Sequence, residues 1–192
     1  MAQAKWIAQS VCTIFGFLTE AECAALISRS EAMSYEPALV STSSGARSIP
    51  DLRNNDRVIV DDPEYAATLW QRLEPLIPPT FQERWRASGL NERLRYYRYD
   101  VGQRFDWHCD GNFWRSDTEE SHFTFMIYLN DDYESGETIF RSLPEYTSVD
   151  LKVQPQTGMA LMFHHPVCHL GATVRGGRKY VLRTDVMYCL TE

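Results

Sequence analysis

The second half of the sequence, from Leu94 onward, most strongly limits the folds open to this chain. Runs of β-branched and aromatic residues alternate there with turn-forming residues, which is typical of a unit built from short strands. About eight such runs begin near residues 94, 104, 122, 137, 149, 158, 168 and 179. Eight short antiparallel strands in two facing sheets make a jelly roll of the cupin type. We therefore predict an α+β chain whose core, residues 91–190, is a double-stranded β-helix.

The last run supports this arrangement through the alternation of its side chains. Successive residues of a strand point to opposite faces of a sheet. One face would carry Tyr180, Leu182, Val186 and Tyr188, and the other Lys179, Val181, Arg183 and Asp185. The first face suits packing under helices, and the second should look into the barrel. Because an unpaired buried ion is costly, something anionic should meet Lys179 or Arg183.

The first half of the chain contains helical patterns. A capping threonine followed by glutamates predicts a helix over about residues 19–33, and apolar spacing predicts a second over about 63–76. A third, shorter helix is expected over 81–90, and a short strand over 10–15. We expect residues 1–90 to be mostly helical and to cover the larger sheet, within a single domain of residues 1–192.

Two side chains able to bind a metal ion, His108 and Asp110, lie two positions apart in the second of the eight runs. Side chains two apart on a strand point the same way, so both could bind one ion while Cys109 faces away. By itself this pair is also typical of a polar surface. His169 supplies a third ligand, and two imidazoles with one carboxylate form the facial triad of non-haem Fe(II) oxygenases. Catalytic zinc sites use the same ligand types.

Four stretches around these residues have a distinctive order. They read Tyr-x-x-Gly-Gln-x-Phe-x-x-His-x-Asp at 99–110, Thr-Phe-Met-Ile-Tyr-Leu-Asn at 124–130, Ser-Gly-Glu-Thr at 135–138, and His-Leu-Gly with Gly-Arg-Lys at 169–171 and 177–179. With them, residues 90–188 resemble the prolyl 4-hydroxylase-like branch of the Fe(II)/2-oxoglutarate-dependent dioxygenases. The departures from the family pattern are Met126, Ser135 and Leu170, and none replaces a candidate metal ligand.

The resemblance implies Fe(II) bound by His108, Asp110 and His169, with 2-oxoglutarate as co-substrate and ascorbate as a candidate reductant. It assigns the distal carboxylate of 2-oxoglutarate to Lys179, ten positions after His169. Lysine is scarce in this chain, and this favours a specific role over a solvent-exposed strand end. Further candidates for co-substrate contacts are Tyr99, Thr124, Arg183 and Tyr128. The implied reaction couples oxidative decarboxylation of 2-oxoglutarate to hydroxylation of a C–H bond by dioxygen.

Residues 41–56 are polar, rich in turn formers and without a hydrophobic period, so we predict a mobile loop. Loops of this length are often lids or binding loops. Arg47 and Arg53 could then recognise a carboxylate or backbone carbonyl of a peptide-like or small-molecule substrate. Phe113 and Trp114 could form an apolar rim. A solvated surface loop and ordinary packing explain these residues equally well.

Composition limits the partners and the location. A net charge of −7 argues against non-specific nucleic-acid binding, which needs a basic face. No stretch reaches the length of a membrane span, and the first residues lack the apolar core of a signal peptide. Five cysteines without a Cys-x-x-Cys pair argue against a disulfide framework and a tetrahedral zinc site. We therefore expect a cytoplasmic protein.

Two alternatives from other functional classes remain. The same three ligands would suit a cupin-like metal-binding or sugar-binding module without redox turnover, or a zinc hydrolase. An inward-facing Lys179 favours the oxygenase, because a plain hydrolase needs no cation there for a dicarboxylate.

Overall fold

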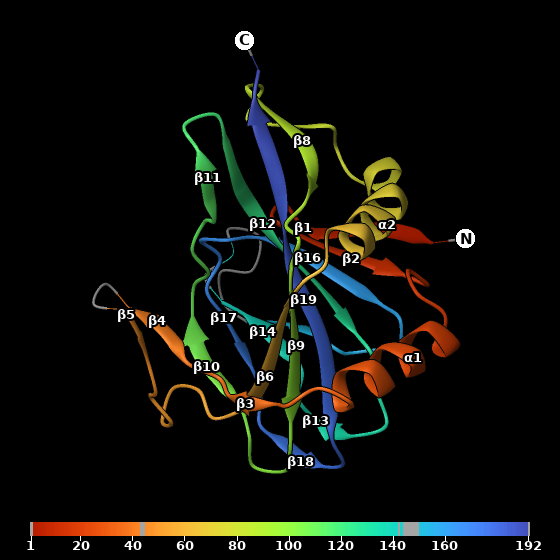
Figure 1. The fold of residues 1–192 in the computed structure, drawn as a ribbon, viewed down its shortest axis with the longest axis vertical. Coiled ribbons are helices and arrows are strands. Elements are labelled where there is room, and N and C mark those ends of the chain that lie inside the picture. The colour runs from red at the N-terminus through yellow and green to blue at the C-terminus, as the bar shows by residue number, and fades with distance from the viewer. Residues whose placement is uncertain (1, 43–44, 142, 144–149, 192) are drawn as a thin grey trace.

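The structure is a computed structural model (Figure 1), and it describes residues 2–42, 45–141, 143 and 150–191. These residues form an eleven-stranded and a four-stranded sheet, in which every strand pair is antiparallel. The main path of the larger sheet is β1 (Gln3–Ala8), β2 (Val11–Phe15), β16 (Ala160–His164), β12 (Glu119–Tyr128), β19 (Lys179–Leu190), β9 (Arg93–Tyr99), β6 (Asp56–Asp61) and β3 (Glu36–Pro37).

Further short strands extend or flank this sheet. Strand β11 (Trp114–Ser116) pairs with β12, β8 (Trp85–Leu90) with β19, and β7 (Thr80–Phe81) with β8. The smaller sheet has the order β10 (Phe105–His108), β17 (His169–Gly171), β14 (Thr138–Phe140) and β15 (Leu151–Val153). Two ribbons complete the described strands: β13 (Glu134–Ser135) with β18 (Val174–Gly176), and β4 (Val40–Thr42) with β5 (Gly45–Arg47).

The two sheets face each other across an apolar interior. Tyr128, Phe163 and Val181 of the larger sheet share one buried cluster with Phe140 and Val153 of the smaller. All eight strands expected after residue 90 are present, as β9, β10, β12, β14, β15, β16, β17 and β19. The predicted jelly-roll core is therefore confirmed.

Two helices cover the outer face of the larger sheet. Helix α1 (Glu20–Glu31) follows a capping box, in which Thr19 Oγ1 accepts from the Glu22 amide and the Glu22 carboxylate accepts from the Thr19 amide. Helix α2 (Pro63–Leu73) begins after Asp62, whose carboxylate accepts from the Tyr65 amide, and continues into the 3-10 helix η1 (Glu74–Leu76).

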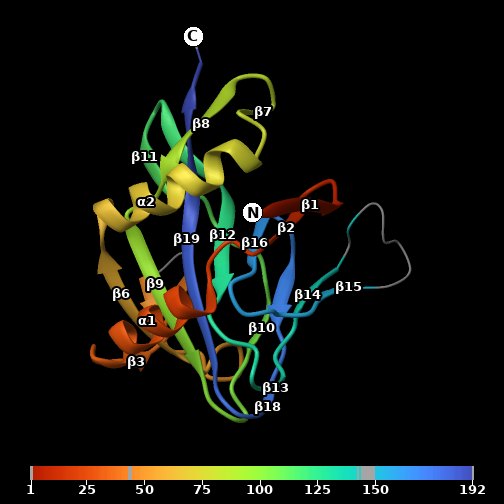
Figure 2. The same ribbon diagram turned by 90° about the vertical axis from the view of Figure 1, so that its right-hand side faces the viewer.

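Apolar side chains of both helices meet the sheet in a second buried cluster. Leu26 of α1 and Leu69 of α2 share it with Leu182 of β19. In Figure 1 the helices lie on one side of β19, with β10 and β17 on the other, and in Figure 2 the helices lie in front of the sheet. The predicted faces of β19 are confirmed, because Tyr180, Leu182, Val186 and Tyr188 join this cluster while Lys179, Val181, Arg183 and Asp185 line the interior cavity.

The first half of the chain differs from the prediction of mostly helical support. Its described residues contain eight strands, β1–β8, and two α-helices. The third helix predicted over residues 81–90 was wrong, because this segment forms β7 and β8 and pairs with the edge of β19. Gly89 within it disfavours a helix, and the ladder with β19 satisfies its backbone amides and carbonyls instead. The single-domain assignment stays a prediction.

The polar segment 41–56 is more ordered locally than a plain loop. It contributes to the β4–β5 hairpin, and Leu52 accepts a 2.7 Å hydrogen bond from the Asp106 amide at β10. Arg53 forms a backbone bridge with Phe105. Residues 43 and 44 lie outside the described residues, and the predicted mobility of this segment stays a prediction.

No helix in the described parts of the chain combines the length and the apolar character needed to span a bilayer.

Candidate metal centre

The three predicted ligands meet at one end of the smaller sheet. His108 closes β10, His169 opens β17, and the two are paired residues of this antiparallel ladder. Asp110 lies just beyond β10, so the prediction that it shares a strand with His108 was wrong, but its amide hydrogen-bonds to the His165 carbonyl at 3.0 Å. This bond fixes the turn that brings the carboxylate back toward both histidines.

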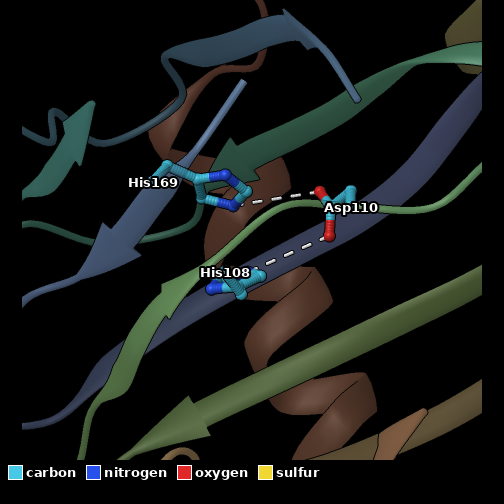
Figure 3. Close-up of side chains that lie close together, drawn as sticks. All are labelled: His108, Asp110 and His169. Carbon is cyan, nitrogen blue, oxygen red and sulfur yellow. Dashed lines mark ion pairs between the residues drawn. The ribbon is translucent and has the colours of Figure 1, made fainter. Parts of the chain in front are cut away.

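The ligand atoms converge on a common point (Figure 3). Nε2 of His108 lies 3.9 Å from Oδ1 of Asp110, and Nε2 of His169 lies 3.8 Å from Oδ2. All three ligand atoms lie within 4.8 Å of one another. Two ligands that each bind one ion at about 2.1 Å can be at most about 4.2 Å apart, so both histidine–aspartate distances fit a shared metal ion.

Both imidazoles are held in the form that binds metals. Nδ1 of His108 lies 2.7 Å from the Asp106 carbonyl, and Nδ1 of His169 lies 3.0 Å from the Val167 carbonyl. Because a carbonyl only accepts, each Nδ1 carries the hydrogen and each Nε2 keeps its lone pair. Burial lowers the pKa of His108 to about 3 and also lowers the pKa of His169. The rings therefore stay neutral at physiological pH.

The carboxylate of Asp110 is kept ionised by its neighbours. Burial alone would raise its pKa, but the Arg183 guanidinium, 3.1 Å away, and the Thr124 hydroxyl outweigh burial and hold the pKa well below the usual range. Thr124 Oγ1 donates a 2.5 Å hydrogen bond to Asp110 Oδ2. Two neutral imidazoles and one carboxylate with fixed orientation are a ligand set suited to a divalent ion with open positions.

Behind Asp110, a chain of polar groups reaches into the larger sheet. Thr124 Oγ1 lies 3.0 Å from Nδ1 of His165, whose Nε2 lies 2.8 Å from Ser121 Oγ. Thr124 and His165 are both buried. Thr124 was predicted to contact 2-oxoglutarate, yet here it holds the candidate metal ligand.

Replacing Thr124 by valine should weaken Fe(II) binding by about tenfold to a hundredfold, the usual effect of losing a group that orients a metal ligand. The affinity for 2-oxoglutarate, measured with saturating Fe(II), should stay unchanged. Thr68→Val is the matched control, because Thr68 is an exposed residue of α2. If the variant keeps its Fe(II) affinity but loses affinity for 2-oxoglutarate, Thr124 contacts the co-substrate instead of supporting the metal ligand.

A cavity of about 610 Å³ opens beside the three ligands and extends to Lys179. Lys179 is buried and forms no ion pair among the described residues; its Nζ donates a 2.6 Å hydrogen bond to the Gly136 carbonyl. Gly136 and Ser135 both have positive φ angles, 80° and 66°, a backbone that favours glycine and aims this carbonyl. The buried amine of Lys179 thus faces the cavity without an ion-pair partner among the described residues.

Aromatic hydroxyl side chains surround this lysine. Its Nζ lies 5.3 Å from the ring centroid of Tyr99 and 5.4 Å from that of Tyr128. Tyr128 shares a 2.7 Å hydrogen bond with Thr138, and burial raises its pKa and that of Tyr99, so both phenols are protonated. Tyr99 and Thr138 line the cavity. The predicted co-substrate roles of Tyr99, Tyr128 and Thr124 stay predictions.

The other predicted residues divide between the cavity and the surface. Arg183 lines the cavity but is paired with Asp110 and Asp185, each at 3.1 Å. Its predicted contact with 2-oxoglutarate stays a prediction. Arg53 and Phe113 also line the cavity. Arg47 on β5 and Trp114 on β11 are exposed and are not among the lining residues.

Sequence reasoning missed several residues of the site. Arg95 and Thr138 line the cavity, and His165 contacts Thr124, which also lines it. Alternation along 93–99 was a usable signal for Arg95, since Tyr97 and Tyr99 lie on the same face. Nothing in the sequence pointed to His165 as the partner of Thr124.

A disulfide bond lies next to the candidate ligands. Cys109, between His108 and Asp110, is joined to Cys168, which precedes His169. The prediction that the five cysteines form no disulfide was therefore wrong for this pair. Fifty-nine residues separate the two cysteines, and only the pairing of β10 with β17 brings them together.

The fold and the three ligands define a jelly-roll protein with a candidate mononuclear metal site. The sequence model of the 2OG-Fe(II) oxygenase superfamily matches residues 94–184. Over residues 94–184 the chain is similar to this superfamily, whose name implies Fe(II) and 2-oxoglutarate, and its fold is that of the prolyl 4-hydroxylases. A search of curated protein sequences finds no match.

Solved structures show the same fold at low sequence identity. A prolyl-4-hydroxylase from Pseudomonas putida is 16% identical with a TM-score of 0.69, over 95% of this chain and 93% of that one. The viral collagen prolyl hydroxylase of Paramecium Bursaria Chlorella virus-1, in its 2OG complex, is 19% identical with a TM-score of 0.60, over 94% and 97%. A Trichoplax adhaerens prolyl hydroxylase in complex with a peptide of the hypoxia inducible factor oxygen degradation domain is 14% identical with a TM-score of 0.72, over 92% and 83%.

Proposed function

We propose that this protein is an Fe(II)- and 2-oxoglutarate-dependent dioxygenase that hydroxylates a C–H bond of its substrate. The observation that carries the proposal is the pairing, in one cavity, of the His108, Asp110 and His169 cluster with the buried, unpaired cation of Lys179. A metal ion at the cluster accounts for the convergent ligand atoms. A dicarboxylate that reaches from the metal to Lys179 would neutralise the lysine.

Each part of this arrangement has a defined task. His108, Asp110 and His169 would hold Fe(II), which when bound supplies the redox chemistry with dioxygen and 2-oxoglutarate. Lys179 would bind the distal carboxylate and set the direction of the co-substrate. Phe105, stacked on His108 with ring centroids 3.5 Å apart, and Phe163 would keep the ligand side of the cavity apolar.

The decisive experiment separates the oxygenase from the two alternatives. Purified protein is given Fe(II) and 2-oxoglutarate without oxygen, and the visible charge-transfer absorption of the chelate is recorded. Oxygen is then admitted and succinate is measured. An oxygenase should give both signals. A cupin-like binding module or a zinc hydrolase should give no succinate above a metal-free control, and that result would refute the proposal.

Finer features of the proposal concern the substrate, the reductant and the location. We propose either a small molecule or a peptide-like chain as substrate and ascorbate as a reductant that restores activity. The net charge of −7 supports the absence of a nucleic-acid partner. We also propose a cytoplasmic location.

The affinity for 2-oxoglutarate should depend on pH through Lys179. Burial lowers the pKa of Lys179 to about 7. Binding of a carboxylate favours the charged amine, so affinity should be highest below about pH 7 and fall by up to about tenfold per pH unit above it. Anaerobic titrations of 2-oxoglutarate between about pH 6 and about pH 9 measure this. Lys179→Arg, which stays charged, should flatten the profile; an equal slope in both proteins would contradict the assignment.

A further inference from the structure

The cavity contains more positively charged side chains than the binding of a metal ion and 2-oxoglutarate requires. Besides Lys179, four arginines line it: Arg53, Arg57, Arg95 and Arg183. Arg95 and Arg183 are neutralised by Asp185, each at 3.1 Å, and Arg183 also contacts Asp110. Within the described part of the chain, Arg53 and Arg57 form no ion pair. Two guanidinium groups are therefore left without an anion.

Arg53 is held rigidly in spite of this. Its side chain is buried, and its guanidinium carbon lies 4.6 Å from the ring centroid of Tyr97 and 4.3 Å from that of Phe105. Nε donates a 2.8 Å hydrogen bond to Asn55, which is itself fully buried. Nη2 is buried and has no hydrogen-bond partner among the described residues. Burying an unpaired cation is costly, so this unsatisfied nitrogen points to a missing anion.

Arg57 completes the positive region. Its Nη1 donates a 3.2 Å hydrogen bond to the Leu39 carbonyl, a neutral partner. Burial and the nearby charge of Arg53 lower the pKa of Arg57. Burial alone would raise the pKa of Tyr97, but Arg53, Arg183 and Arg95 outweigh it and lower the pKa to about 8. The shift of Tyr97, and in part that of Arg57, reflects a positive potential that an anion would relieve.

This region is close to the metal ligands yet separate from Lys179. The Phe105 ring contacts both the Arg53 guanidinium and the His108 imidazole, so one ring joins the arginine to the metal side of the cavity. Lys179 instead contacts Gly136 and the rings of Tyr99 and Tyr128. A molecule bound at Arg53 would therefore lie beside the metal while 2-oxoglutarate occupies Lys179.

We propose that Arg53 and Arg57 form an anion subsite that binds a carboxylate of the substrate, so that the substrate is a small carboxylic acid. The inference rests on the proposed function, since it names the substrate class of the same cavity. A neutral peptide carbonyl would satisfy one N–H group but would leave both charges uncompensated. A carboxylate can accept two parallel hydrogen bonds from a guanidinium and neutralise it as well.

The test compares carboxylic acids with their own amides. The probes are straight-chain and aromatic monocarboxylic acids and the primary amides of the same acids, titrated calorimetrically into protein that holds Fe(II) and 2-oxoglutarate without oxygen. In the wild type at least one acid should bind about tenfold to a hundredfold more tightly than its amide, as expected for hydrogen bonds to a charged group. If no acid binds more tightly than its amide, the subsite is refuted.

Variants then test whether the two arginines cause the preference for an acid over its amide. Arg53→Gln and Arg57→Gln should each lower the acid-to-amide affinity ratio toward one and leave amide binding unchanged. Arg47→Gln is the matched control, because Arg47 is an exposed arginine of the same segment and should not change the ratio. Arg57→Gln is the second variant should Arg53→Gln fail to fold, since Arg57 is only half-buried. An unchanged ratio in a folded variant of either residue overturns its assignment.

Failure of the subsite and failure of the proposed function remain distinguishable. The Kd of 2-oxoglutarate should be the same in Arg53→Gln as in the wild type; a rise equal to that for the acids would make Arg53 a co-substrate residue and overturn the inference. The acid and amide titrations are repeated on metal-free protein. An acid preference that persists there would support the subsite independently of the metal. If the Fe(II)-loaded protein neither binds 2-oxoglutarate nor forms succinate, the oxygenase is refuted while the subsite stands.

Discussion

Replacing any one of His108, Asp110 and His169 by alanine should lower the Fe(II) affinity by more than about a hundredfold, because losing a group that merely orients a ligand already costs about tenfold to a hundredfold. Oxygen-dependent succinate formation should fall to the background of the metal-free protein. The geometry gives the reason: each residue contributes one of only three convergent ligand atoms. Fe(II) binding is measured anaerobically by competition with a chromophoric chelator, and succinate after oxygen is admitted.

The matched control is His164→Ala. His164 is half-buried on β16 and packs against Phe81 and Phe123, on the side of the sheet away from the cavity. It should keep both Fe(II) binding and succinate formation. Circular dichroism checks that each variant is folded. Full succinate production by a variant of the three candidate ligands would remove that residue from the metal site.

The jelly-roll core could be predicted because its strands carry the alternation that burial requires. On β19, one face contributes to the buried cluster that the helices share, through Tyr180, Leu182, Val186 and Tyr188. The other face lines the cavity, through Lys179, Val181, Arg183 and Asp185. Shifting the strand by one residue would place Lys179 and Arg183 among the apolar side chains under the helices. The register was therefore strongly specified by the sequence itself.

The errors concern segments whose structure depends on distant partners. Residues 81–90 could pass for a helix because Phe81, Trp85 and Leu90 are apolar, but the open edge of β19 pairs with them as a strand. The Cys109–Cys168 bond joins residues that are brought together only by the pairing of β10 with β17. Such long-range pairing leaves no local trace in a single sequence.

The sequence indicated the candidate metal ligands better than it indicated the ion pairs around them. The motif spacing led to His108, Asp110 and His169, and to an inward Lys179, all of which meet at one cavity. The ion pairs of Arg183 with Asp110 and of Arg95 with Asp185 were not foreseen, because a guanidinium can reach several carboxylates. Sequence alternation places Arg183 and Lys179 on one face of β19 but does not show which of them forms an ion pair. In the structure Arg183 is paired with two carboxylates, and Lys179 forms no ion pair among the described residues.

Replacing Lys179 by methionine should raise the Kd of 2-oxoglutarate by roughly two orders of magnitude or more. Removing one partner of a desolvated ion pair costs about 3–5 kcal/mol, and each tenfold in affinity is about 1.4 kcal/mol. The protein without co-substrate should stay folded, because methionine replaces a buried amine with an apolar chain of similar length. Fe(II) binding should also be unchanged, since Lys179 contacts none of the three ligands. The affinity is measured anaerobically from the charge-transfer absorption.

Two controls make this result specific to Lys179. Lys152→Met removes an exposed lysine of β15 and should leave the Kd of 2-oxoglutarate unchanged. Arg183→Met should raise it less than Lys179→Met, because Arg183 is already paired with Asp110 and Asp185; it should instead weaken Fe(II) binding, since Asp110 loses the group that orients its carboxylate. If Arg183→Met has the larger effect on 2-oxoglutarate, the co-substrate anchor is Arg183. Lys179 would then be a buried lysine held in place by Gly136 and its two tyrosines, with no carboxylate to bind.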